Sequence, residues 1–265
     1  MLRQADAYAG PGIEGEKYVQ LARREVVPPQ RFLRLPNIVD EAAFLRRDDT
    51  IDAGRRWLSE RGLDVNRPTV VWPARLRGAK GILPFLDRWA EVRPPGWQVL
   101  LLGQGELRAE VLASIERLRL GESVRLFDYI DHRQMPAIYA VSTLFLLPSL
   151  HDPNPLSVVE AMHSGLPLLI SSRLGNYPEA LAPGENGWGF DPDKPADVAD
   201  AIRSATSSSE GRRREMGVAS ARIAARYWSS REATQRFVSG LLDLVASGPE
   251  GRGRGTVVSS NRNVE

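Results

Sequence analysis

The sequence predicts a doubly wound parallel α/β sheet, a Rossmann-like fold. Three observations carry this prediction. The chain has 265 residues of which 42% are hydrophobic, enough to bury a sizeable core. Its strands are short continuous apolar runs, as expected of strands buried on both faces. They alternate with amphipathic helices, which right-handed crossovers place on both sides of the sheet. Ligands of such sheets bind at the carboxyl ends of the strands, near the point where strand order reverses.

Five strands are predicted, each an apolar run bounded by turn-forming or charged residues: 69–74, 97–103, 123–130, 143–149 and 166–172. The helices between them are expected at 80–92, 106–120, 134–141 and 156–165. Pro84 is compatible with a helix only near its start, and Gly165 is a suitable stop for the last of these helices. After residue 190 the pattern is helical, over 195–206, 211–227 and 231–247.

The two ends of the chain fit this alternation less well. Residues 1–36 hold an expected strand, helix and strand at 5–10, 14–25 and 31–35. Residues 37–66 are interpreted as a connection, and 67–247 as one domain. The segment 248–265 is glycine-rich and unpatterned, which is typical of a disordered tail.

Composition excludes several classes of protein. The 35 basic and 33 acidic residues give a net charge of +2, which argues against a nucleic-acid binder with a concentrated basic face. The absence of cysteine excludes disulfides, thiolate nucleophiles and Cys-ligated zinc. His132, His151 and His163 lack H-E-x-x-H spacing, and no site for a metal is predicted. With no apolar signal sequence and no apolar run of about 18 residues, we expect a cytoplasmic protein. Peripheral contact with the inner membrane surface stays open.

The segment 151–172 is the most informative. Its two X-Pro steps within 152–155 impose an extended, stiff loop, with Asn154 suited to cap a helix and Pro155 to begin it. The unbonded amides of the first turn and the positive end of the helix dipole then form an anion site. Those amides belong to Leu156, Ser157 and Val158.

Polar residues of the same helix share one face. Ser157, Glu160 and Ser164 are spaced i, i+3, i+7. A phosphate at the helix start would leave Glu160 about one turn away, where its carboxylate could accept two hydrogen bonds from a ribose diol. A capped amphipathic helix with a solvated polar stripe explains the same pattern.

A second candidate segment, 72–81, follows the first predicted strand. Arg75 and Lys80 lie on its loop, which Gly78 and Gly81 make flexible, so the two cations could hold a diphosphate. The alternative is two solvated loop cations.

Two further segments match known ligand-binding motifs but are better explained as turns. G-Q-G-E-L-R at 103–108 resembles a dinucleotide loop, but Arg108 replaces the third glycine and a simple turn explains it. The D-P-D at 191–193 has the form of a metal motif, although its central proline is typical of a turn.

Taken in order, these segments resemble retaining glycosyltransferases of family 4, which have the GT-B fold. Arg75-Leu76 with Lys80-Gly81 matches the family's G-R-L-x-x-x-K-G, and Asp152 through Glu160 its E-x7-E. G-N-Y-P-E at 175–179 and E-N-G-W-G-F-D-P at 185–192 match two later motifs, and L-P-N-I-V-D-E-A-A-F at 35–44 matches the link between the family's two domains. The resemblance, from about 67 to 240, implies the C-terminal half of a GT-B fold, with 1–36 as a remnant of the acceptor domain and 37–66 as the interdomain connection.

The resemblance also implies roles for particular residues. It assigns the donor diphosphate to Arg75 and Lys80, the ribose to Glu160 and the donor sugar to Asp152. The remaining donor contacts are the amides of Leu156 and Ser157 and the strand end at Tyr129 and Ile130. By the same resemblance Asp152, Arg75 and Lys80 are the catalytic candidates.

This sequence departs from the family pattern at three places. Asp152 replaces a glutamate, Asn154-Pro155 replaces F-G, and Asp128 stands where glycine is usual.

The resemblance implies transfer of a sugar from a UDP- or GDP-sugar to a saccharide or lipid-linked acceptor, with retention and without a metal or other cofactor. The alternative is a catalytically incomplete nucleotide-sugar binding half, or one subunit of a split enzyme, whose partner is a missing N-terminal domain. A nicotinamide oxidoreductase, supported only by 103–108, is a third hypothesis. If the acceptor domain is missing, Tyr8, Tyr18, Leu21 and Phe32 are expected to have lost the sheet they cover.

Overall fold

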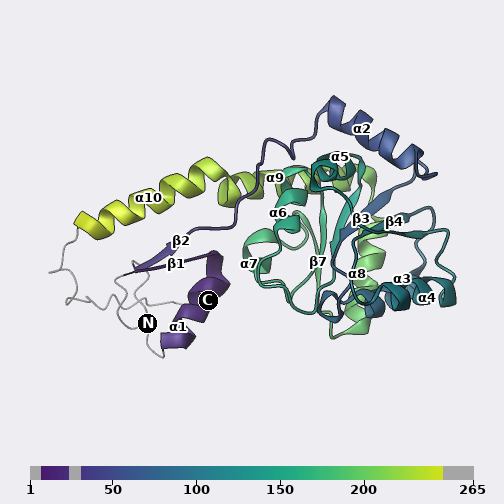
Figure 1. Ribbon diagram of the computed structural model, residues 1–265, viewed down its shortest axis with the longest axis horizontal. Helices are drawn as coiled ribbons and strands as arrows, with labels where there is room; N and C mark the ends of the chain where they lie inside the picture. The colour runs from purple at the N-terminus through teal and green to yellow at the C-terminus, as the bar shows by residue number, and fades with distance from the viewer. Residues whose placement is uncertain (1–6, 24–30, 247–265) are drawn as a thin grey trace, which may run out of the picture.

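Six parallel strands form the central sheet of the computed structural model, which describes residues 7–23 and 31–246 (Figure 1). Their order is β5-β4-β3-β6-β7-β8, so the direction of winding reverses between β3 and β6. The predicted doubly wound α/β fold is confirmed. The strand bounds are β3 Thr69–Pro73, β4 Gln98–Leu102, β5 Val124–Phe127, β6 Leu144–Leu147, β7 Leu168–Ser171 and β8 Gly187–Phe190.

Helices cover both faces of this sheet because successive residues of each buried strand point to opposite sides. Val70 and Trp72 of β3 pack into a core with α3, α4 and α8, whereas Val71 packs into a second core with α2, α5, α6 and α9. Figure 1 shows the two helical layers. Their bounds are α2 Asp48–Ser59, α3 Ile82–Val92, α4 Arg108–Arg117, α5 Met135–Val141, α6 Leu156–His163, α8 Pro195–Ser207 and α9 Glu210–Trp228. Three short helices lie between them: η3 Gly78–Lys80, η4 His132–Gln134 and α7 Tyr177–Ala180.

The three short helices, strand β8 and helix α2 were not predicted. The sixth strand, β8, has the sequence G-W-G-F, which carries no strand pattern; its Gly187 lies so close to β7 that a Cβ atom would be 2.1 Å from the Leu168 carbonyl oxygen. Helix α2 lies inside 37–66, which was interpreted as a connection, and packs on α5. The predicted strand 123–130 ends early, at Phe127.

Gly54 sets the contact between α2 and α5. A Cβ atom there would lie 2.2 Å from the Ala137 carbonyl oxygen and 2.6 Å from a methyl group of Val141. We expect Gly54→Ala to lower the free energy of unfolding by roughly 1–3 kcal/mol, because the backbone of α5 must move to admit the methyl group. Urea denaturation measures the change. The matched control is Gly211→Ala on α9, where no atom lies within 4 Å and the substitution should stabilise the helix.

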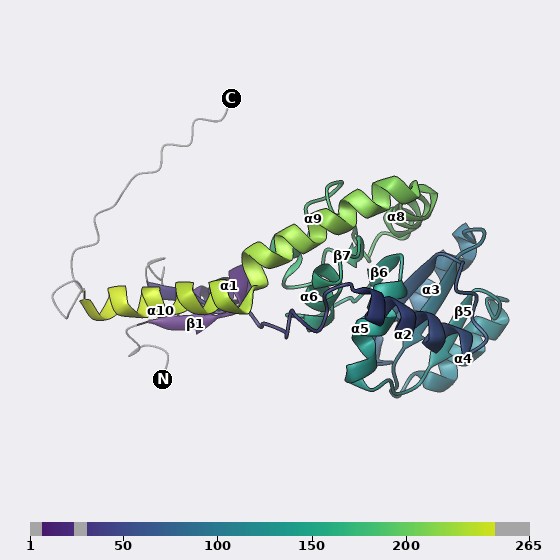
Figure 2. The same cartoon turned by 90° about the horizontal axis from the view of Figure 1, so that it is seen from above.

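The remaining elements form a separate N-terminal lobe: β1 Tyr8–Gly10, α1 Gly12–Arg23, β2 Phe32–Arg34 and α10 Ser230–Ala246. Strands β1 and β2 are parallel, and α10 leaves the end of α9 to pack on β2 (Figure 2). Tyr8 and Phe32 are buried together with Val19, contrary to the expected loss of cover, whereas Tyr18 and Leu21 are 70% and 78% exposed. The predicted tail at 248–265 and the start of the predicted strand at 5–10 lie outside the described residues.

In the parts of the chain that the structure describes, no helix combines the length and apolar character needed to cross a membrane.

Candidate functional site

A cavity of about 540 Å³ opens at the carboxyl ends of β3 and β4. We call it the edge cavity, after the edge of the sheet that the carboxyl ends of the strands form. Four of the predicted site residues line it: Arg75 after β3, Tyr129 and Ile130 after β5, and Glu160 on α6. Its place beside the point where strand order reverses is the one expected of a ligand site in an open α/β sheet.

Close backbone packing shapes the floor of the edge cavity. A Cβ atom on Gly103, whose φ is +152°, would lie 1.9 Å from the Ala74 carbonyl oxygen, and one on Gly105 would lie 2.5 Å from that of Leu76. The Leu76 amide donates to Gln104 O at 3.0 Å, and the Leu107 amide to Leu76 O at 3.0 Å. The glycines of 103–108 therefore allow two strand-end loops to touch, which favours the turn interpretation of this segment.

Glu160 is a buried carboxylate whose two oxygens have separate partners. The side chain of Glu160 is 9% exposed; the Tyr139 hydroxyl donates to Oε2 at 3.0 Å, and Oε1 lies 3.0 Å from His132 Nε2. Burial, together with the charge of Glu160, raises the pKa of Tyr139 well above its ordinary value, so this hydroxyl remains a donor. The solvated-stripe alternative is therefore wrong for Glu160.

The two partners of Glu160 were not predicted. His132 lies before α5 and Tyr139 on it, and no spacing in the sequence relates either residue to Glu160. Both rings also pack near Phe44, at centroid distances of 5.9 Å. The signal that could have found them is the position of α5 directly after the strand end at Tyr129 and Ile130.

Lys80 and Asp152 form an ion pair, and their side chains are 21% and 14% exposed. Backbone contacts bring their loops together: the amides of Leu150 and His151 donate to Ala79 O at 2.9 and 3.2 Å, and the Gly175 amide donates to Asp152 O at 2.8 Å. Lys80 does not line the edge cavity, whereas the exposed Arg75 does. The two predicted phosphate ligands thus lie in adjoining positions rather than in one cavity.

The start of α6 differs from the prediction by one residue. Pro155, not Asn154, is the N-cap, and the helix begins at Leu156. The Val158 amide donates to Pro155 O at 3.3 Å, so the amides left without an intrahelical bond are those of Leu156 and Ser157. Asn154 does not cap the helix because its side chain is turned elsewhere: its amide nitrogen is buried, and the residue lines a different cavity.

Ser164 does not share a ligand-facing stripe with Glu160. It is the C-cap of α6, is 1% exposed and lines a cavity at the opposite edge of the sheet. An eight-residue helix runs about the length of the neighbouring strands, so its last residue lies at the amino ends of the strands and cannot reach the carboxyl ends where the helix began.

Two departures from the sequence patterns meet in space. Arg108, which replaces a glycine in 103–108, donates to Asp128, which stands where the family has glycine, at 2.6 and 3.0 Å. This guanidinium holds the pKa of Asp128 below its usual range. The pair is exposed, next to Tyr129, beside the edge cavity.

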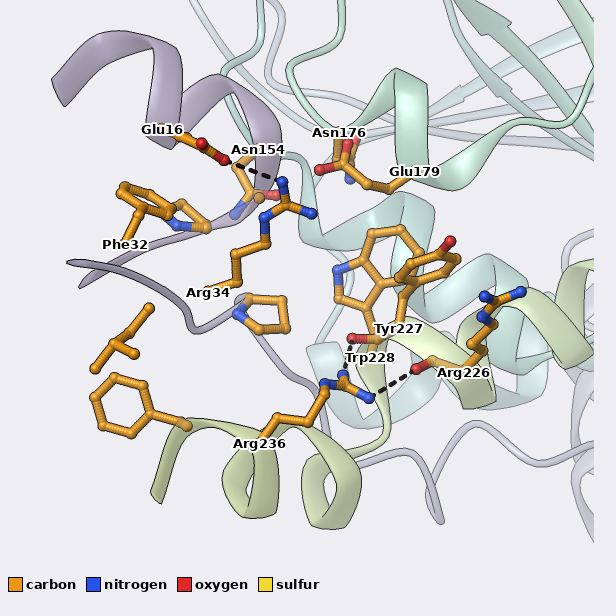
Figure 3. Close-up of a pocket in the computed structure, with 15 residues that line it drawn as sticks. Glu16, Phe32, Arg34, Asn154, Asn176, Glu179, Arg226, Tyr227, Trp228 and Arg236 are labelled. Atoms are coloured by element: carbon orange, nitrogen blue, oxygen red, sulfur yellow. Dashed lines mark hydrogen bonds and ion pairs between the residues drawn. The ribbon is translucent and has the colours of Figure 1, made fainter. Parts of the chain in front are cut away.

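A second cavity, of about 660 Å³, lies between the N-terminal lobe and the α/β domain (Figure 3). We call it the lobe cavity. It contains three buried polar atoms without a hydrogen-bond partner: Asn154 Nδ2, Asn176 Oδ1 and Glu179 Oε2. The other oxygen of Glu179 accepts a hydrogen bond from the Ile13 amide at 2.7 Å, which links the α/β domain to the N-terminal lobe. Arg34, paired with Glu16 at 3.0 Å, forms the facing wall.

Within residues 7–23 and 31–246, no three side chains of the metal-ligating types are grouped closely enough to hold a metal ion.

The fold and the edge cavity together define a Rossmann-like nucleotide-binding domain of the GT-B type. A family model for "Glycosyl transferases group 1" matches residues 55–221. The chain belongs to this family of glycosyltransferases.

Several known proteins are similar to this chain in sequence or in fold. The alpha-D-kanosaminyltransferase of Streptomyces kanamyceticus is 25% identical over 211 residues, covering 78% of this chain and 53% of that protein. Sucrose-phosphate synthase from Thermosynechococcus elongatus superposes with a TM-score of 0.75 at 21% identity, covering 93% of this chain and 60% of that one. The Anabaena protein HepE in complex with UDP gives 0.77 at 19% identity, covering 91% and 65%. The chain spans about half the length of its kanosaminyltransferase relative.

Proposed function

We propose that the chain forms the donor-binding half of a retaining glycosyltransferase of family 4, using a UDP- or GDP-sugar. The observation that carries the proposal is the gathering of Arg75, Glu160, Tyr129 and Ile130 around one cavity at the carboxyl edge of the sheet. Family membership supplies the reaction class, and the cavity supplies room for a nucleotide.

Each part of the donor has a candidate partner. Glu160, oriented by Tyr139 and His132, accepts hydrogen bonds from the ribose hydroxyls. The base lies against the exposed strand end at Tyr129. The diphosphate extends toward the start of α6, where the amides of Leu156 and Ser157 donate to it.

Lys80 can serve the diphosphate while keeping Asp152. An ammonium group has three N–H donors, so one can remain on the Asp152 carboxylate and another can reach a phosphate oxygen. Asp152 in turn faces the sugar. This pairing offers a reason for aspartate in place of the family's glutamate, since the shorter side chain still reaches Lys80.

The proposed reaction proceeds on one face of the sugar. The bond from the anomeric carbon to the phosphate oxygen breaks, and its electron pair leaves with the nucleoside diphosphate. The acceptor hydroxyl forms the new bond on the same face and gives its proton to the departing phosphate oxygen. Arg75, Lys80 and the start of α6 stabilise the charge that develops there.

The lobe cavity is the proposed place for the sugar and acceptor hydroxyls. Its unpaired buried groups are a donor, Asn154 Nδ2, and two acceptors, Asn176 Oδ1 and Glu179 Oε2, and all three are suited to hydroxyl partners. Asn154 lies two residues from Asp152, which places this cavity next to the reacting end of the donor.

A second candidate function is binding of a nucleotide sugar without catalysis. The proposed donor contacts around the edge cavity all come from the α/β domain, which is all that this function requires. Calorimetric titration with UDP, GDP and NAD tests the shared donor site: tight binding of NAD with none of UDP or GDP would reject both functions. Release of nucleotide from UDP- or GDP-sugars then separates catalysis from binding.

Replacing Arg75 or Lys80 by alanine is expected to weaken UDP or GDP binding by about 1.5–3 kcal/mol and uridine or guanosine binding far less, because a nucleoside carries no charge for these groups to meet. Lys80→Ala should have the larger effect, since it also leaves Asp152 without its cation. Arg77→Ala, an exposed arginine lining the same cavity, is the matched control. Equal losses for nucleoside and nucleotide would mean that the two cations only hold the loop.

A further inference from the structure

A third cavity, of about 680 Å³, lies at the edge of the sheet opposite to the edge cavity. Pro68, Thr143 and Pro167 line it, and these residues directly precede β3, β6 and β7. Because all strands of the sheet are parallel, this edge is the one remote from the donor site. We call it the opposite cavity.

Positive charge dominates the wall of the opposite cavity. Its charged lining residues are four arginines and a single acid, Glu210. Glu210 bonds Arg214 at 2.7 Å. Arg67 is fixed by the carbonyls of Gly96, Trp97 and Glu122 at 3.1, 2.7 and 3.3 Å. Arg213 lies over the Trp97 ring at 5.1 Å. Backbone carbonyls and rings hold these guanidinium groups without neutralising them.

Arg46 has no counter-ion among the residues that the structure describes. Partial burial of the guanidinium lowers the pKa of Arg46, and the positive charges of Arg214 and Arg55 lower it further, although the residue as a whole is exposed. An unpaired arginine among like charges attracts an anion to this wall of the cavity.

A buried hydroxyl in the same wall also lacks a partner. Ser164 is 1% exposed, and its Oγ has no hydrogen-bond partner among the described residues. The neighbouring His163 is 8% exposed; burial lowers its pKa, and its ring already bonds the backbone of Trp228, which does not line this cavity. Buried polar groups in folded proteins almost always have partners, so the unpaired hydroxyl of Ser164 indicates a ligand.

We propose that the opposite cavity is a second ligand site, which binds a small phosphorylated anion. A phosphate group offers the negative charge that Arg46 lacks and the acceptor oxygens that a guanidinium and a hydroxyl can serve together. The cavity has room for a sugar phosphate or a nucleotide. Ser164 and the unpaired guanidinium of Arg46 are the recognition groups, and Arg67 and Arg213 supply fixed positive potential.

Pyrophosphate is the probe, titrated by calorimetry at constant ionic strength into the chain saturated with UDP, so that the edge cavity is occupied. We expect one equivalent to bind to the original chain. Arg46→Ala should weaken this affinity at least tenfold and Ser164→Ala several-fold. Arg125→Ala, an exposed arginine on edge strand β5, should leave it unchanged.

Thermal unfolding separates a lost site from a lost fold. Without pyrophosphate, Arg46→Ala should melt at or above the temperature of the original chain, because it removes a cation without a counter-ion; with pyrophosphate only the original chain should gain stability. Should Arg46→Ala fail to fold, Ser164→Ala carries the test. Equal pyrophosphate affinity in the folded variants, or no binding to the UDP-saturated chain, overturns the proposal.

The phosphate group that this cavity would bind could also be part of a lipid headgroup. Sedimentation with phosphatidylcholine vesicles, with and without phosphatidylglycerol, distinguishes the sources. We expect no Arg46-dependent sedimentation with either vesicle. Binding to anionic vesicles combined with no binding of free pyrophosphate would show that the cavity meets a membrane and would reject the small-ligand site.

Discussion

Glu160→Gln is expected to weaken UDP and GDP binding by about 1.5–3 kcal/mol, one to two orders of magnitude in affinity, because a charged hydrogen bond to the ribose is lost. The domain should stay folded, since the glutamine keeps the shape of the side chain and its Oε can still accept from Tyr139. Isothermal calorimetry measures the affinity, and circular dichroism checks the fold.

Glu106→Gln is the matched control for this prediction. Glu106 lines the same cavity and is exposed, so its substitution removes one negative charge without touching the proposed ribose contact. Should Glu160→Gln bind UDP and GDP as tightly as the original chain, the ribose assignment would be wrong.

The second large effect concerns turnover. We expect the chain as given to bind nucleoside diphosphates but to transfer sugar slowly or not at all, because an opposing domain normally positions the acceptor and excludes water. Such positioning can lower a barrier by roughly 7–11 kcal/mol. Nucleotide release from UDP- and GDP-sugars, measured with candidate saccharide acceptors, should therefore stay near background and rise when a matching N-terminal domain is supplied.

Hydrogen exchange provides an independent check on this prediction. Among the described residues, the sheet of the N-terminal lobe has two strands and its buried cluster has three side chains, so the described residues within 7–36 should exchange much faster than 69–172. Vigorous acceptor-dependent turnover by a polypeptide of these residues alone would contradict this prediction.

Strands buried on both faces were predictable because burial alone makes them continuous apolar runs. T-V-V-W-P and L-F-L-L needed no tertiary information. By contrast, close contact with neighbouring residues requires two glycines in β8. A four-residue run with two glycines lacks the apolar pattern that predicts a strand. Helix α2 is amphipathic, with Gly54, Trp57 and Leu58 buried on one face, so its pattern could have been predicted from the sequence.

The candidate site was predictable as residue types at strand and helix ends, but not as contacts. The sequence placed Arg75, Tyr129 and Glu160 at the correct edge because parallel strands bring their carboxyl ends together. The pairing of Lys80 with Asp152, 72 residues apart in the sequence, depends on backbone hydrogen bonds between their two loops. The partners of Glu160 depend on how α5 packs beside α6, which no local spacing encodes.

The packing of α10 on β2 has a consequence for synthesis on the ribosome. Leu33 of β2 meets Gly240, whose added Cβ would lie 2.6 Å from a methyl group of Leu33, so β2 is covered by a helix that is made only after the whole central sheet. All six strands of the central sheet lie between these two positions and can fold as a unit before α10 leaves the exit tunnel. The N-terminal lobe must therefore wait, with part of its apolar surface uncovered, until α10 has been synthesised.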